Sequence, residues 1–114
     1  MAHYLIAPSI LSADFAHLGR ETRKVIEAGA DWLHFDVMDG HYVPNLSLGP
    51  MVCASLKKEV NLIPIDAHLM VEKVDVFINA FLQAGATYIS FHPEATWHPH
   101  RSFCLLYTSD AADE

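Results

Sequence analysis

The fold is indicated most directly by the nine residues AGADWLHFD at positions 28–36, which recur in similar form as AGATYISFH at positions 84–92. Each copy places a glycine, a residue that commonly ends a helix, shortly before an apolar run of strand length. Near-continuous apolar runs of this kind are typical of parallel strands covered on both faces. The repeat predicts stacked β/α units. The alternative is chance similarity, because any helix-to-strand connection can use glycine in this way.

Strand and helix patterns alternate along the rest of the chain. The expected strands cover residues 4–10, 32–37, 62–70 and 87–92, and the expected helices cover residues 20–28, 50–58 and 74–84. Ser12 and Asp14 offer capping side chains ahead of the first helix. This alternation predicts an α/β fold with parallel strands joined by right-handed crossovers.

Composition restricts the class of protein. The 114 residues are 52% hydrophobic and 18% charged, a balance that argues against disorder. The apolar runs are too short for a transmembrane helix, and the N-terminus lacks the features of a secretory signal. A formal charge of −7 disfavours nucleic acid and anionic membrane surfaces as partners. Cys53 and Cys104 show no C-x-x-C spacing, which favours a reduced, cytoplasmic protein.

Polar side chains interrupt two of the expected strands. His34 and Asp36 are two residues apart, as are Asp66 and His68. Residues at this spacing share one face of a strand, and parallel β/α folds place active sites at the carboxyl ends of their strands. We expect His34, Asp36 and His68 to converge on one divalent ion, Zn²⁺, Fe²⁺, Mn²⁺ or Co²⁺, because two imidazoles and one carboxylate suit such ions. Asp66 lies deeper and is expected to form a supporting hydrogen bond.

Each candidate also has a structural interpretation. An isolated histidine in a strand is more often a satisfied core residue, and Ser9 is placed where a turn or capping serine is common. Met38 and Met70 stand just beyond the proposed ligands, where methionine ordinarily fills gaps in packing. His92 occupies the position of Asp36 in the repeat, which is not enough to make it a ligand.

Four separated segments resemble the ribulose-phosphate 3-epimerase family. They are, in chain order, APSILSADF at 7–15, HFDVMDGHYVPN at 34–45, PIDAHLM at 64–70 and FHPEA at 91–95. The resemblance covers about residues 3–97. It implies a parallel (β/α)8 barrel of the TIM type, of which the chain would hold about the first four β/α units. It also implies metal-dependent epimerisation at C3 of D-ribulose 5-phosphate to D-xylulose 5-phosphate through an enediolate, in the pentose phosphate pathway.

The same resemblance assigns roles to single residues. Asp36 would be the catalytic base and would bind the metal together with His34 and His68. The implied substrate-binding residues are Ser9, His68, Met38 and Met70. The complete protein would act on a small sugar phosphate and would form a homo-oligomer.

Two parts of the family pattern are not found in residues 97–114, namely an opposing aspartate on a later strand and a glycine-rich phosphate loop. One carboxylate can serve only one face of the inverted carbon, so we expect the chain alone to lack activity. Two alternatives remain open. One is a relative that acts on a six-carbon ketose 6-phosphate such as allulose 6-phosphate, and the other is a non-functional half-barrel fragment.

The C-terminal sequence CLLYTSDAADE breaks the alternation of strands and helices. It resembles the translation of a sequencing adapter read through the end of a DNA fragment. We therefore expect a native segment over residues 1–103 and a non-native tail over residues 104–114.

Overall fold

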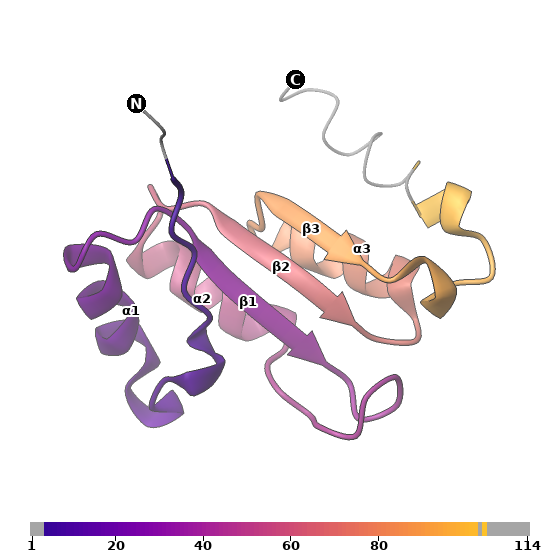
Figure 1. The fold of residues 1–114 in the computed structure, drawn as a ribbon, viewed down its shortest axis with the longest axis horizontal. Coiled ribbons are helices and arrows are strands. Elements are labelled where there is room, and N and C mark those ends of the chain that lie inside the picture. The colour runs from indigo at the N-terminus through magenta and orange to yellow at the C-terminus, as the bar shows by residue number, and fades with distance from the viewer. Residues whose placement is uncertain (1–3, 103, 105–114) are drawn as a thin grey trace.

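The computed structural model describes residues 4–102 and 104. Three parallel strands form one sheet in the order β1-β2-β3, with β1 at Leu33–Met38, β2 at Ile65–Met70 and β3 at Tyr88–Phe91. The helices of this region are α1 at Leu18–Glu27, α2 at Pro50–Glu59 and α3 at Val74–Gln83, with short 3₁₀ turns at Ile10–Ser12, Phe15–His17 and Pro93–Ala95. In Figure 1, α2 and α3 lie behind the sheet and α1 lies beside them. The predicted α/β class with parallel strands is confirmed.

The two faces of the sheet bury different kinds of side chain. Along β1 and β2, buried residues alternate with half-buried ones. The buried set, which includes Leu33, Phe35 and Val37, joins the hydrophobic core with residues of α2 and α3. The half-buried set includes His34 and Asp36 and lies on the opposite face. Within the described residues only one face carries helices, so the expectation of strands covered on both faces is not met.

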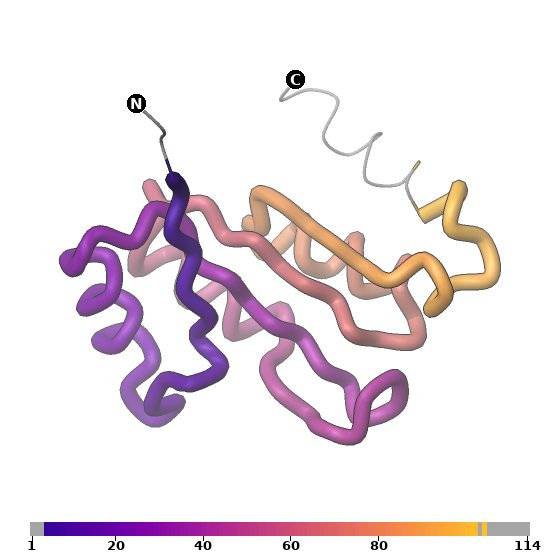
Figure 2. Tube along the Cα trace, in the orientation of Figure 1, coloured from indigo at the N-terminus to yellow at the C-terminus, as the bar shows by residue number. Residues whose placement is uncertain are grey.

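The first expected strand, over residues 4–10, is wrong as a strand. It forms a single parallel bridge between Ser9 and His34. Backbone N–H groups at and just before the start of β1 donate to the carbonyl oxygens of Ile6 and Pro8. Pro8 has no N–H with which to extend the ladder. The segment therefore lies along β1, as Figure 2 shows, without becoming a fourth strand.

The other boundaries agree with the sequence expectations to within one or two residues, with one exception. The strand expected over residues 62–70 begins at Ile65, because the Ile63 N–H donates to the Val60 carbonyl in the turn after α2. Capping also differs in part. Asp14 accepts from the Ala16 N–H as expected, whereas the cap of the preceding 3₁₀ turn is Ser9.

The sequence repeat has a structural counterpart at the ends of α1 and α3. Gly29 and Gly85 both have positive φ, at 113° and 99°. In each case the N–H groups of the glycine and of the next alanine donate to carbonyl oxygens in the last turn of the helix. This is the Schellman arrangement, which favours glycine. The predicted helix ends are therefore confirmed in both copies.

Replacing Gly85 by alanine is expected to destabilise the chain more than replacing Gly29. Both changes place a side chain at positive φ, which costs about 1–2 kcal/mol. A Cβ at Gly85 would lie 2.8 Å from Lys57 Cγ, whereas one at Gly29 would meet nothing within 4 Å. Lys57 is anchored, because its Nζ donates to the Ile63 carbonyl at 3.1 Å. Urea unfolding of Gly85→Ala, Gly29→Ala and the parent chain measures the difference, and equal losses would show that Lys57 moves without cost.

The core centres on two phenylalanines that are fully buried. Phe35 of β1 and Phe81 of α3 meet edge to face with ring centroids 5.6 Å apart. Cys53 of α2 is also buried, and burial raises the pKa of its thiol to about 11, so it stays protonated at neutral pH. Cys53 and Cys104 are both free.

Two expectations concern the ends of the chain and its relation to membranes. The predicted non-native tail over residues 104–114 lies outside the described residues apart from Cys104, and it stays a prediction. None of the helices in the described residues has the length and apolar character needed to cross a membrane.

Candidate metal centre

Strands β1 and β2 bring the three predicted metal ligands together. Their register pairs Asp36 directly with His68, and His34 lies on the same face of β1 as Asp36. One potential ligand atom from each of the three side chains lies within 4.8 Å of the others. All three residues are half-buried, on the sheet face opposite the helices.

The Asp36 carboxylate lies between the two imidazole rings. Its Oδ1 is 3.0 Å from His34 Nε2 and 3.4 Å from His68 Nδ1. Two imidazole nitrogens and a carboxylate oxygen facing one point are a donor set suited to Zn²⁺ and similar divalent ions. The residues present therefore fit a divalent cation. His34, Asp36 and His68 are the side chains that would hold it.

Asp66 of β2 forms the hydrogen bond expected of it. Its Oδ2 lies 3.0 Å from His34 Nδ1, the ring nitrogen that faces away from Asp36. A carboxylate only accepts hydrogen bonds, and His34 Nε2 faces a second one, Asp36 Oδ1, also at 3.0 Å. With a cation held at Nε2, the His34 proton would sit on Nδ1 and donate to Asp66. Metal-binding histidines are commonly oriented in this way.

Ser9 has the capping role considered for it from sequence and also contacts Asp36, whereas substrate binding by Ser9 stays a prediction. Its Oγ accepts a hydrogen bond from the Leu11 N–H at 3.2 Å, which caps the following 3₁₀ turn. The same hydroxyl donates to Asp36 Oδ2. Ser9 therefore fixes the carboxylate oxygen that does not face the histidines.

Met38 and Met70 end β1 and β2 on the face that carries the ligands. The register places them directly opposite each other, and both are half-buried. They border the polar cluster at the carboxyl ends of the two strands. Contact with a substrate stays a prediction for both methionines.

His92, which follows β3, is the residue at this site that sequence reasoning left unassigned. Its Nε2 lies 2.9 Å from His68 Nε2. Its ring also lies near that of Tyr42, with centroids 5.5 Å apart. The sequence signals were its place in the repeat and in the segment FHPEA at 91–95, neither of which indicated which side chain it would meet.

Asp39 joins two loops at this end of the sheet. Its Oδ1 accepts from the N–H groups of His41 and Tyr42, and its Oδ2 accepts from the N–H of Glu72, each at 2.9 Å. Desolvation acts to raise the pKa of Asp39, but these three backbone donors outweigh it, and the pKa is lowered. Asp39 is therefore charged at neutral pH and fixes the loop that carries Tyr42.

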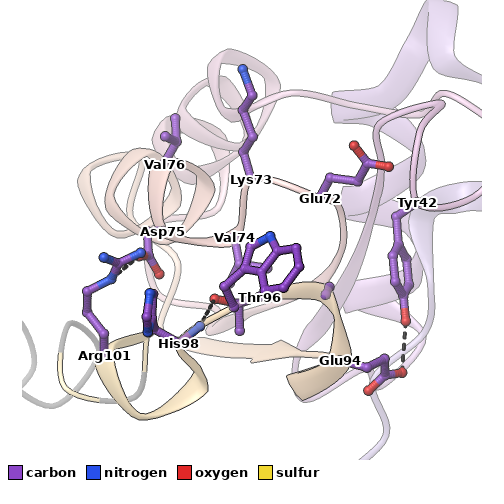
Figure 3. A pocket seen from close by; sticks show the side chains of 12 residues that line it. Tyr42, Glu72, Lys73, Val74, Asp75, Val76, Glu94, Thr96, His98 and Arg101 are labelled. Carbon is purple, nitrogen blue, oxygen red and sulfur yellow. Dashed lines mark hydrogen bonds and ion pairs between the residues drawn. The ribbon is translucent and has the colours of Figure 1, made fainter.

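A broad hollow of about 910 Å³ lies beside the candidate metal centre and is shown in Figure 3. Its walls include Tyr42 and Glu94 but none of the three candidate ligands. Several polar groups in it satisfy one another. Arg101 Nε donates to Asp75 at 2.8 Å, and the Tyr42 hydroxyl donates to Glu94 at 2.8 Å. The hollow is therefore distinct from the centre that the strands build.

Comparison with known proteins gives a consistent result. The model of the Ribulose-phosphate 3 epimerase family matches residues 5–109. Curated proteins named ribulose-phosphate 3-epimerase from Buchnera aphidicola (strain APS), Serratia marcescens and Escherichia coli K12 are each 58% identical to the chain over 106 residues. These matches cover 93% of this chain but 46%, 50% and 47% of the relatives, so the chain spans about half their length. The chain belongs to the ribulose-phosphate 3-epimerase family.

Proposed function

We propose that this chain forms the metal-binding and proton-abstracting part of an enzyme that interconverts D-ribulose 5-phosphate and D-xylulose 5-phosphate, a reaction of the pentose phosphate pathway in the cytoplasm. The observation that carries the proposal is the convergence of His34, Asp36 and His68 on one face of the sheet. The proposal is also supported by the relatives, which share the name ribulose-phosphate 3-epimerase. In the complete protein the sheet would continue into a (β/α)8 barrel, and the complete chains would form a homo-oligomer.

Inversion at C3 requires a base next to the ketone. Removing the C3 proton gives an enediolate, and returning a proton to the opposite face inverts the carbon. In this proposal Asp36 takes the proton, which is supported by its half-buried carboxylate and by the hydrogen bond from Ser9 that orients it. A divalent ion held by His34, Asp36 and His68 would stabilise the negative charge that develops on the substrate oxygens.

Return of the proton requires a second acid on the other face of the substrate. Among the described residues, Asp66 lies on the same sheet face as Asp36, so it would approach the substrate from the same side. The second acid would therefore come from a part of the protein outside the described residues. On this basis we propose that the chain alone is inactive.

Joining residues 1–103 to the C-terminal half of the Escherichia coli relative tests the proposal. We expect the chimera to convert D-ribulose 5-phosphate to D-xylulose 5-phosphate, and the 114-residue chain alone to show no conversion. Chelation should abolish turnover of the chimera, and Zn²⁺, Fe²⁺, Mn²⁺ or Co²⁺ should restore it. A folded chimera that accepts only allulose 6-phosphate would contradict the proposed substrate, and unchanged turnover after verified metal removal would contradict the metal.

A further inference from the structure

We propose that His92 is a positioning residue that sets the proton on the His68 ring. In this arrangement His68 Nε2 donates its proton to His92 Nε2, which leaves His68 Nδ1 free to bind a cation beside Asp36. The inference rests on the proposed metal function. It adds to the three candidate ligands a fourth residue, His92, that would orient one of them.

The argument begins with the two nitrogens of His68. Nδ1 lies 3.4 Å from Asp36 Oδ1, and Nε2 lies 2.9 Å from His92 Nε2. A neutral imidazole carries one proton, so two ring nitrogens at this separation form a hydrogen bond only if one donates and the other accepts. If His68 donates, its Nδ1 lone pair faces the cluster. If His92 donates, the His68 proton sits on Nδ1, where it faces Asp36 Oδ1 at 3.4 Å and blocks metal binding. A cation at Nδ1 displaces this proton, so the first arrangement belongs to the cation-bound chain.

Glu94 favours the first of these arrangements. Its Oε1 lies 3.6 Å from His92 Nδ1. A carboxylate next to Nδ1 stabilises a proton on that nitrogen and so leaves His92 Nε2 as an acceptor. Glu94 is itself held as an anion, because its own backbone N–H and the Tyr42 hydroxyl lower the pKa of its carboxyl. In the cation-bound chain, the charge next to His92 therefore favours the tautomer in which His92 Nε2 accepts from His68.

Tyr42 restrains the His92 ring in this orientation. The two rings are tilted by 31° with centroids 5.5 Å apart, and the Tyr42 hydroxyl donates to Glu94 at 2.8 Å. Figure 3 shows this hydroxyl directed at the Glu94 carboxylate. Tyr42 belongs to the loop after β1, while His92 and Glu94 follow β3. Contacts from Tyr42 and from Glu94 thus hold the His92 ring in place.

The two histidine ligands are then supported in the same way. The ring nitrogen of His34 that faces away from the cluster meets Asp66 at 3.0 Å, and that of His68 meets His92 at 2.9 Å. Groups that hold the second nitrogen of a metal-binding histidine typically contribute about 10- to 100-fold to metal affinity. We expect His92 to contribute within this range.

Titration of the metal-free 114-residue chain with Co²⁺, followed by visible absorption, measures this contribution. His92→Phe removes the acceptor and keeps a ring against Tyr42, whereas His92→Gln keeps an acceptor. We expect His92→Phe to weaken Co²⁺ binding by about 10- to 100-fold and to change the absorption band, and His92→Gln to recover part of the loss. His98→Phe makes the same change at an exposed histidine and should leave the affinity unchanged. Circular dichroism checks that each variant is folded.

A second measurement does not depend on any substitution. Nitrogen-15 NMR of the histidine rings in the Zn²⁺-bound chain reports which nitrogens of His68 and His92 carry protons. We expect protons on His68 Nε2 and on His92 Nδ1, and a proton on His92 Nε2 would overturn the inference.

The possible titration results separate the inference from the proposed function. If the parent chain binds no Co²⁺, the proposed metal function fails and the inference fails with it. If the parent binds Co²⁺ and His92→Phe binds it equally well, only the inference fails. If His92→Gln binds as weakly as His92→Phe, an acceptor at this position does not restore binding and the proposed hydrogen bond is rejected.

Discussion

Replacing Asp36 by asparagine in the chimera is expected to lower turnover of D-ribulose 5-phosphate by at least about 10³-fold. Asparagine keeps the shape of the side chain and can still accept the Ser9 hydrogen bond, but it offers no basic oxygen for the C3 proton. It also removes the negative charge between His34 and His68, which lie 3.0 and 3.4 Å from Asp36 Oδ1. A coupled assay of D-xylulose 5-phosphate formation measures the loss. In heavy water, entry of deuterium at C3 should fall in parallel.

The same substitution at Asp66 is the matched control. Asp66 lies on the same sheet face, and its asparagine variant still offers an oxygen that accepts from His34 Nδ1. We therefore expect a loss of no more than about 10- to 100-fold, through weaker metal binding. Asp36→Asn near the parent rate would remove Asp36 from the catalytic role. Equal losses at the two positions would show that the charge of the cluster matters and that base catalysis does not.

The alternation within β1 and β2 could be predicted from sequence because it depends only on local geometry. Side chains two residues apart on a strand share a face. The spacing within each strand was therefore enough to pair His34 with Asp36 on one face of β1 and to pair Asp66 with His68 on one face of β2. That both pairs share one face of the sheet follows from the register of the two strands. The glycines after α1 and α3 were similarly informative, because the Schellman ending has a local sequence requirement that Gly29 and Gly85 meet.

The segment over residues 4–10 shows where local reasoning fails. It is apolar enough to resemble a strand, yet Leu5 and Ile6 are each 59% exposed in the structure. Strand formation depends on pairing and burial more than on intrinsic preference. The segment pairs with β1 through a single bridge at Ser9. The extent of this pairing depends on the folded structure and cannot be inferred from the sequence of the segment.

The supporting contacts of the site other than that of Asp66 were not predicted, because each joins residues far apart in the chain. The Ser9 to Asp36 hydrogen bond spans 27 residues, and the Tyr42 to Glu94 hydrogen bond spans 52. The contact between His68 and His92 depends on the register of β2 and β3 and on the rotamers of both rings. A repeat can indicate that His92 ends a strand, but the neighbour that it meets follows from the fold.

Replacing Phe35 by alanine is expected to lower the free energy of unfolding by about 3–5 kcal/mol. Phe35 lies in the middle of β1, is fully buried, and meets Phe81 edge to face. A domain of this size is typically stable by about 5–15 kcal/mol, so the loss would remove a large part of the total. Urea unfolding followed by far-ultraviolet circular dichroism measures it. Leu62→Ala is the control, because Leu62 is 89% exposed and its truncation should change stability by less than about 0.5 kcal/mol.

A double-mutant cycle with Phe81→Ala separates the aromatic contact from general burial. Each single change removes the edge-to-face pair, so the double variant should lose less than the sum of the two, by about 0.5–1.5 kcal/mol. Strict additivity would show that the rings contribute through buried area alone. A loss below about 1 kcal/mol for Phe35→Ala would be more serious, because it would mean that the core beneath β1 is not formed in solution. Since His34 and Asp36 flank Phe35 on that strand, the candidate metal centre would then lose its support as well.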